Sequence, residues 1–307
     1  MKLLTVQRWA WFTIIYILFV ILWGAYVRAT GSGAGCGDHW PLCNGVVIPR
    51  DAAIETLIEL THRVTSGLSL IFVIVLFILA RKSVTHGHPL RRAAAFALFF
   101  IIVEALIGAG LVLFELVAHN ASLKRMFSMS AHLLNTFALL SALSLCIWRS
   151  SESKPHRHAP FRLMVKESSI LIIALGLIFA GMTGAIAALG DTLYAGFGPL
   201  PLKAYLDGEV PLILRLRLVH PVVSVVTAVL ILVVQSKLWK FYRDPLTSRL
   251  GWSLSGLLLV QLALGFVNVQ LMAPVWMQLV HLAVGVFLWV ISTFFSFCVI
   301  DNKPKFF

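Results

Sequence analysis

The sequence has few charged residues for its length. Only 12% of its 307 residues are charged, whereas 59% are hydrophobic and the mean hydropathy is +0.91. Soluble domains carry charge on about a quarter of their residues, so the composition excludes an ordinary soluble domain and indicates a membrane protein. A membrane-spanning helix needs about 20 mostly apolar residues. Eight stretches qualify: 9–27, 57–80, 93–117, 127–148, 168–189, 211–234, 251–272 and 275–299.

Acidic residues are scarce too, at 13 against 25 Lys and Arg, which gives a net charge of +12. Such an excess can mark a nucleic-acid-binding protein. If the N-terminus is cytoplasmic, however, 17 of the 25 basic residues fall on the cytoplasmic side, where membrane proteins retain positive charge. The charge therefore predicts a topology with both termini in the cytoplasm, and no nucleic-acid partner. The stretch 9–27 lacks a clear A-x-A cleavage site, so we expect a retained helix rather than a signal peptide.

The two halves of the chain resemble each other at offsets of 149 to 160 residues. Four matches occur in the same order: Gly24-Ala25-Tyr26 with Gly184-Ala185-Ile186, Leu60–Val64 with Leu218–Val222, Glu104–Gly108 with Gln261–Gly265, and Ser130–Leu133 with Leu279–Leu282. Because each half holds an even number of spans, the repeat is parallel. We therefore expect an all-α polytopic membrane protein of two four-helix bundles, residues 1–150 and 167–307, joined by a cytoplasmic linker at 151–166.

Four of the ten histidines fall inside predicted spans: His62, His132, His220 and His281. Each lies five to nine residues into an even-numbered span, which places all four about 8–14 Å below the outer end at about 1.5 Å per residue. One such histidine can simply join helices by a hydrogen bond, but ionisable groups at matched depth favour a functional site. Histidines on facing helices of a bundle can supply both axial ligands of a heme. No Asp, Cys or third His shares the layer with either pair, so a bare metal ion fits less well.

Two glutamates of the first half have no acidic counterpart in the second. Glu59 precedes His62 by three residues and shares its helix face, whereas Arg217 stands at the matching position. A carboxylate beside a heme can take up a proton or stabilise a developing cation; an acid early in a helix also suits the helix dipole. Glu104, matched by Gln261, lies near the midplane and can transfer protons or hydrogen-bond across the bundle. Three arginines can pair with heme propionates or extend to the membrane surface: Arg63, Arg215 and Arg217.

The four cysteines fall into two kinds. Cys146 and Cys298 lie near the inner ends of spans, where we expect small buried side chains. Cys36 and Cys43 lie in the first outer loop, on the oxidising side of the membrane, so a disulfide is expected. It can act as a structural link or as a redox pair that exchanges electrons with a partner thiol. The glycines of the same loop do not form a dinucleotide motif, because no strand precedes them.

The loop Thr30–Cys36 with Trp40–Gly45, the Glu59-Leu-Thr-His62-Arg63 segment and the three later histidines together resemble the heme A synthase family over essentially the whole chain. The resemblance implies oxidation of the C8 methyl of heme O to a formyl group by successive hydroxylations, giving heme A for cytochrome oxidase assembly. It implies a heme b cofactor on His220 and His281, and substrate heme on His62 and His132. It also implies that Glu59 is catalytic. Cys36 and Cys43 match a loop pair of some members; the second pair that some members carry is missing.

Two other functions stay open at this point. The histidines can hold two permanent hemes of a b-type electron-transfer cytochrome, or the protein can carry heme unchanged as a transporter or chaperone. For the synthase, the expected partners are heme O, a heme O synthase, a thiol or quinone redox partner and membrane lipid. A homo-oligomer is left open, and the expected location is a bacterial plasma membrane.

Overall fold

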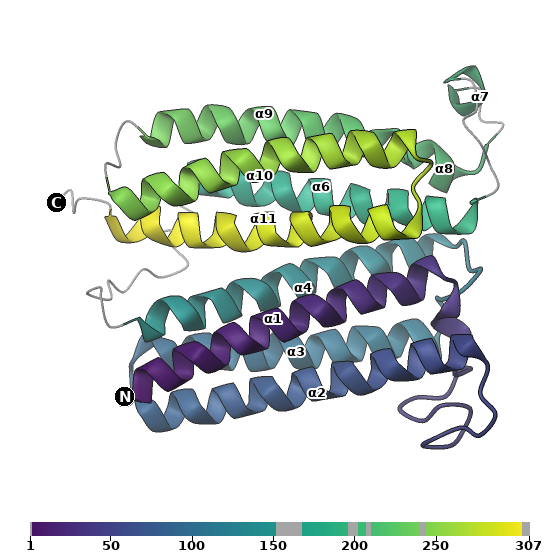
Figure 1. Cartoon of the computed structure of the whole chain (residues 1–307), viewed down its shortest axis with the longest axis horizontal. Helices are drawn as coiled ribbons and strands as arrows, with labels where there is room; N and C mark the ends of the chain where they lie inside the picture. Colours follow the sequence, from purple (N-terminus) through teal and green to yellow (C-terminus); the bar gives the residue numbers. More distant parts are fainter. Residues whose placement is uncertain (1, 152–167, 196–201, 207–209, 240–243, 303–307) are drawn as a thin grey trace.

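The computed structural model describes residues 2–151, 168–195, 202–206, 210–239 and 244–302 (Figure 1). The helices within them are α1 (Lys2–Ala29), α2 (Ile54–Ser83), α3 (Pro89–Leu113), α4 (Leu123–Ser150), α6 (Ser168–Leu193), α7 (Leu202–Leu206), α8 (Leu212–Leu216), α9 (Val219–Trp239), α10 (Pro245–Gln270) and α11 (Val275–Asn302), with a 3₁₀ turn η1 (Ser32–Ala34). Eight spans are long and apolar enough to cross a membrane, counting α8 and α9 as one. The predicted all-α polytopic fold is thus confirmed, while nearly all of the predicted linker lies outside the described residues.

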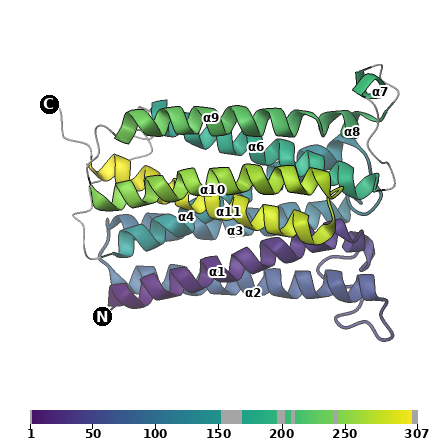
Figure 2. The same ribbon diagram turned by 45° about the horizontal axis from the view of Figure 1, so that its top comes forward.

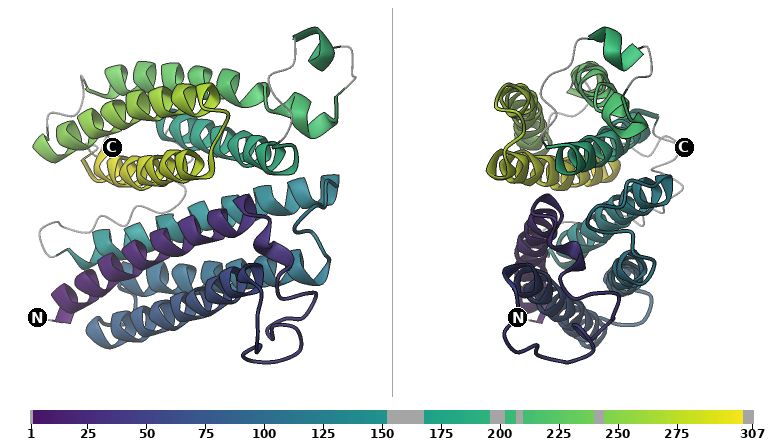
Figure 3. Two further views of the ribbon diagram at one scale, coloured as in Figure 1. Left: turned by 45° about the vertical axis from the view of Figure 1, so that its right-hand side comes forward. Right: turned by 90° about the vertical axis from the view of Figure 1, so that its right-hand side faces the viewer.

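The spans pack as two groups of four. Helix α1 contacts α2 and α4, and α3 contacts α2 and α4; in the other group α6 contacts α9 and α11, and α10 contacts both α9 and α11. The end-on view in Figure 3 separates the two bundles, and Figure 2 shows that the long loop after α1 and the short helix α7 lie at one end. We call this the loop end. The repeat relation and the cytoplasmic side remain predictions from the sequence.

Side chains that cap helices explain where three spans begin. The side chains of His88, Ser122 and Asp244 accept hydrogen bonds from backbone N–H groups in the first turns of α3, α4 and α10. Such caps satisfy N–H groups that have no partner inside the helix. In α3 and α10 a proline follows the cap, where its missing N–H costs no hydrogen bond.

Two spans end earlier than the sequence predicts. Helix α3 stops at Leu113 instead of residue 117, and α10 stops at Gln270 instead of residue 272. The chain takes positive φ values at Glu115 (53°) and at Met272 (58°), a left-handed conformation that ends a right-handed helix. Neither residue is a glycine or asparagine, so the apolar pattern carries no signal for these ends.

The sixth span is broken, although the sequence predicts one continuous stretch over 211–234. Arg217 and Leu218 separate α8 from α9. Pro221 follows this break, and a proline cannot donate to the carbonyl four residues earlier, which here belongs to Arg217. The missing bond and the clash of the ring with that carbonyl account for the break. His220 therefore lies in the first turn of α9.

The two bundles are joined along α4 and α11, with α1 and α6 beside them. The rings of Phe137 in α4 and Trp289 in α11 stack at 4.3 Å between centroids and 10° between planes, and Trp289 Nε1 donates to the Phe137 carbonyl at 2.9 Å. A Cβ on Gly181 of α6 would lie 2.9 Å from Cε2 of Phe137. The halves thus meet in close, interdigitated packing.

Candidate functional site

The second-half histidines lie opposite each other in their bundle, with their rings nearly perpendicular. The rings of His220 in α9 and His281 in α11 have centroids 6.3 Å apart and planes at 82°. Nδ1 of His220 is within hydrogen-bonding distance of Thr183 Oγ1 (3.2 Å) and Ser224 Oγ (3.3 Å). Those contacts leave Nε2 of His220 for another partner. On the opposite ring, Nε2 of His281 lies 3.2 Å from Nε2 of Gln261.

The first-half pair, His62 in α2 and His132 in α4, lies eight and nine residues after the starts of these helices. Both rings are half-buried, as are those of the second half. The Nδ1 atoms of His62, His132 and His281 are buried and make no hydrogen bond of good geometry within the described residues. The Nδ1 edges of these three rings are therefore covered by neighbouring atoms.

Glycines lie against three of the four histidine rings. A Cβ would lie 2.8 Å from Cε1 of His62 at Gly24, 3.0 Å from Cε1 of His220 at Gly184 and 3.2 Å from Cε1 of His281 at Gly265. These are glycines that the repeat comparison had already paired, Gly24 with Gly184 and Gly108 with Gly265. Gly108 is the exception, since a Cβ there would meet nothing within 4 Å. The glycines therefore let the rings lie against the neighbouring helix.

Glu104 lies beside His132 in the first half. Its Oε1 is 3.3 Å from Nδ1 of His132. Asn135 Nδ2 donates to Oε2 at 2.6 Å, and the Thr136 hydroxyl donates to Oε1. The carboxylate from α3 is thus held by two donors on α4, one helical turn beyond the histidine. The sequence did contain a signal for this cluster, because residues three and four places after His132 share its helix face.

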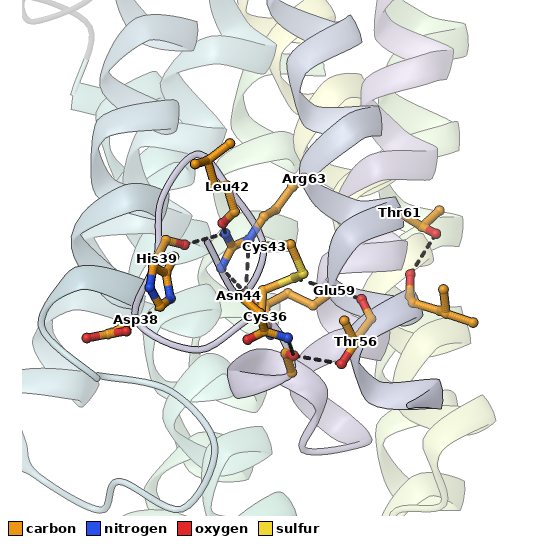
Figure 4. Close-up of a disulfide and its surroundings, with 12 residues drawn as sticks. Cys36, Asp38, His39, Leu42, Cys43, Asn44, Thr56, Glu59, Thr61 and Arg63 are labelled. Atoms are coloured by element: carbon orange, nitrogen blue, oxygen red, sulfur yellow. Dashed lines mark hydrogen bonds and ion pairs between the residues drawn. A yellow bond between two sulfur atoms is a disulfide. The ribbon is translucent and has the colours of Figure 1, made fainter. Parts of the chain in front are cut away.

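Glu59 is 3% exposed and lies under the loop after α1, as Figure 4 shows. Arg63 donates to its Oε1 through Nε (3.1 Å) and Nη2 (2.5 Å), and the backbone N–H of Cys36 donates to Oε2 at 2.8 Å. Nη1 of Arg63 donates to the carbonyls of His39 and Leu42, both at 2.6 Å. The ion pair therefore ties the loop to α2. This ion pair was not predicted from the sequence, although the i, i+4 spacing of Glu59 and Arg63 is typical of such pairs.

The loop itself is closed by a disulfide. Cys36 and Cys43 are bonded, with their Cα atoms 4.4 Å apart and both side chains fully buried, so the predicted disulfide is confirmed. Thr56 Oγ1 donates to the Gly35 carbonyl at 2.7 Å, which adds a second link to α2. The other two cysteines, Cys146 and Cys298, are buried, as expected.

A polar cluster at the loop end joins the two bundles and was not predicted. Arg28 of α1 donates to Thr192 Oγ1 of α6 at 3.2 Å and to Gln278 Oε1 of α11 at 3.1 Å. Nε of Arg217 lies 3.1 Å from Asp191 Oδ1. These contacts fix the loop end of α6 between the halves. Nothing in the repeat pattern indicated them, because Arg28 and Asp191 have no matched partners in the sequence comparison.

No group of three or more His, Cys, Asp or Glu side chains suited to a metal ion occurs among the residues that the structure describes. The four histidines lie two in each bundle, His62 and His132 in the first and His220 and His281 in the second. Whether they act as ligands, and which half plays which role, remains a prediction from the sequence.

Comparison with known proteins adds an independent observation. Residues 7–293 match the family described as cytochrome oxidase assembly protein. A Thermus thermophilus protein named protoheme IX farnesyltransferase is 42% identical over 97% of this chain and 49% of its own length. The heme A synthase of Staphylococcus saprophyticus is 29% identical over 87% of this chain and 86% of its own length. The heme A synthase of Halalkalibacterium halodurans is 38% identical over 58% and 60%. The chain spans about half the length of the Thermus relative.

Proposed function

The chain belongs to the cytochrome oxidase assembly protein family, and from this premise we propose that it is a heme A synthase. In this reaction the C8 methyl of heme O is oxidised to a formyl group by successive hydroxylations. Relatives of similar length carry the name heme A synthase, which supports the proposal. The observation that supports it furthest is that each bundle contains two intramembrane histidines, and that the rings of His220 and His281 lie 6.3 Å apart.

The residues of the second half fit a heme, and we propose that it is heme b held by His220 and His281. Imidazole nitrogens bind first-row metals at about 2.0–2.1 Å, so two rings on one metal have centroids roughly 6.3 Å apart. The centroid separation in this chain is 6.3 Å. The rings of His220 and His281 pack so closely on Gly184 and Gly265 that a Cβ there would lie only 3.0 and 3.2 Å from their Cε1 atoms. A bound heme supplies a redox-active iron that can pass electrons.

Within this site the residues of the chain have separate tasks. Thr183 and Ser224, which contact Nδ1 of His220, orient that ring and keep Nε2 free as the ligand atom. On the other helix, Gln261 contacts Nε2 of His281. An amide that donates to this nitrogen competes for the same lone pair, so ligand binding requires Gln261 to turn away.

In the first half we propose that His62 and His132 bind the substrate heme, with Glu59 assisting oxidation of the methyl group. Support comes from the asymmetry between the halves: Glu59 and the disulfide loop exist only in the first. The ion pair with Arg63 keeps the loop over the start of α2. A loop fixed in this way can exclude water from the oxidation step, while Cys36 and Cys43 are proposed as a redox pair for a partner thiol.

The proposed partners follow from the same comparison. A similar protein is named protoheme IX farnesyltransferase, and farnesylated heme is the substrate of a heme A synthase. We therefore propose that the chain receives heme O from a farnesylating enzyme in the same membrane. The eight apolar spans make it a multi-pass membrane protein, and the basic segments support cytoplasmic termini in a bacterial plasma membrane.

Pigment extraction tests the proposed function. Cells that lack their own heme A synthase but contain a heme O synthase would be supplied with this chain, and the extracted hemes separated by chromatography. We expect heme O to be replaced by heme A or its hydroxylated precursor. If heme O persists while a b-type spectrum is present, the chain is a di-heme cytochrome or a heme carrier instead.

A further inference from the structure

We propose that Glu104 is a positioning residue of the first-half site: with iron bound, its carboxylate accepts a hydrogen bond from Nδ1–H of His132. This inference rests on the proposed function, because it takes His132 as an iron ligand. In this role the carboxylate makes His132 a more basic iron ligand. The two sites would therefore differ in reduction potential.

The contacts of Glu104 match such a role. Nδ1 of His132 is buried and lacks a hydrogen bond of good geometry among the described residues, and Oε1 of Glu104 lies 3.3 Å away. Asn135 Nδ2 and the Thr136 hydroxyl hold the two carboxylate oxygens. Asn135 Nδ2 also donates to the Phe100 carbonyl of α3 at 2.9 Å. The carboxylate is therefore fixed next to the ring rather than free to move away.

The second half provides an internal comparison. Gln261 takes the place of Glu104, and the positions three and four after His281 are Val284 and Gly285. None of the donors that hold the carboxylate in the first half is kept there. Oε1 of Gln261 is buried without a hydrogen bond within the described part of the chain. The acid and its two donors thus occur together in one half and are absent together from the other.

The rings also lie differently in the two halves. His281 packs on Gly265, where a Cβ would be 3.2 Å from its Cε1, whereas Gly108 at the matching place has nothing within 4 Å. His132 is thus not seated on the glycine of the neighbouring helix, and its Nδ1 lies beside the Glu104 carboxylate instead. A donor–acceptor contact therefore takes the place of the glycine contact on this side of the first-half site.

The chemical consequence follows from the tautomer. A carboxylate that accepts from Nδ1–H leaves the lone pair on Nε2 and makes the imidazole a more basic ligand. A more basic ligand and a nearby negative charge both stabilise ferric over ferrous iron. In the second half the neutral Gln261 cannot do this. The first-half heme should therefore have the lower reduction potential. This suits a site whose bound heme is the substrate of the oxidation.

The test uses the full chain in detergent, loaded with heme B in both halves, with reduction potentials followed by absorbance and ferric g values by electron paramagnetic resonance. Glu104→Gln is expected to make reduction of the first-half heme at least tenfold more favourable, which is about 59 mV for a one-electron couple. The ferric g values of this heme should change as well, since they report ligand basicity. The reduction potential of the second-half heme should not change.

Gln261→Glu is the matched control, and it serves also if Glu104→Gln does not fold. It should make reduction of the second-half heme less favourable and leave the first-half heme unchanged. If Glu104→Gln moves neither the potential nor the g values, or if it shifts both hemes equally, the inference is wrong. His132→Ala separates this failure from failure of the proposed function: if that variant keeps both hemes, the ligand assignment itself is wrong.

Discussion

At the scale of single residues, the missing Cβ of a glycine lets a histidine ring pack closely against the neighbouring helix. Gly24→Ala would place a Cβ 2.8 Å from Cε1 of His62, and forcing such a contact costs about 1–3 kcal/mol. We expect first-half heme affinity to fall about tenfold or more, measured by heme titration of the purified protein. The second-half spectrum should not change.

Gly108→Ala is the matched control, because a Cβ at this position meets nothing within 4 Å. Alanine is the better helix former, so the variant should bind heme normally and be slightly more stable. If both variants lose heme equally, contact with the histidine ring does not explain the glycine at position 24. Helix packing in general would then be the reason.

Glu59 gives the second prediction at this scale. Glu59→Ala removes the acceptor for Arg63 and for the Cys36 N–H, which leaves a buried cation without its partner and costs several kcal/mol locally. We expect turnover of heme O to stop while the b-type spectrum of the second half remains. Chromatography of hemes and an absorbance spectrum of the same preparation check both parts.

An Arg63→Ala variant shows which function of the ion pair matters. This variant removes the hydrogen bonds to the loop carbonyls of His39 and Leu42 but keeps the carboxylate of Glu59. If Arg63→Ala retains turnover and Glu59→Ala does not, the carboxylate acts in the oxidation itself. Loss of the b-type spectrum in Glu59→Ala would instead mean that this residue maintains the fold.

Only some features of these residues can be predicted from the sequence alone. The four histidines and the disulfide could be singled out, because intramembrane ionisable groups and cysteines in an oxidising loop are rare enough to be informative. The partners of Glu59 could not be predicted in full. They include loop atoms of Cys36, whose approach to α2 depends on how the whole loop folds.

At the scale of helices, Pro221 has the clearest effect. Pro221→Ala would restore the N–H that can donate to the Arg217 carbonyl, so that α8 and α9 could join into one continuous helix. We expect the heme-free protein to become more stable to heat. Heme b should bind less tightly, since His220 is adjacent to the break between α8 and α9.

Thermal unfolding without heme, together with heme b titration, checks this prediction. Val222→Ala is a suitable control, because Val222 is exposed on the same turn and its change alters no backbone donor. An unchanged heme affinity in Pro221→Ala would show that the break does not position His220.

Some helix ends can be predicted from the sequence and others cannot. The starts of α3, α4 and α10 follow from capping residues and proline, which are visible in the sequence. The ends of α3 and α10 depend on left-handed backbone at Glu115 and Met272, which these residue types do not indicate. The break before α9 was readable in principle from Pro221, but the continuous apolar run concealed it.

At the scale of the whole molecule, two bundles are held in fixed relation by a stacked aromatic pair and a polar cluster. Phe137 and Trp289 join the bundles in the middle of the spans, and Arg28 joins them at the loop end. Neither link was predicted, because contacts between repeats leave no periodic pattern in the sequence. A rigid junction keeps the two proposed heme sites at a constant separation, as electron transfer between them requires.

The measurement that tests this account most directly is the heme content of two purified variants, His132→Ala and His281→Ala, prepared from cells that make heme O. We predict that His281→Ala loses heme b and that His132→Ala keeps heme b but no longer binds heme O. If both variants lose the same heme, or if neither loses any, the assignment of one histidine pair and one heme to each bundle is wrong.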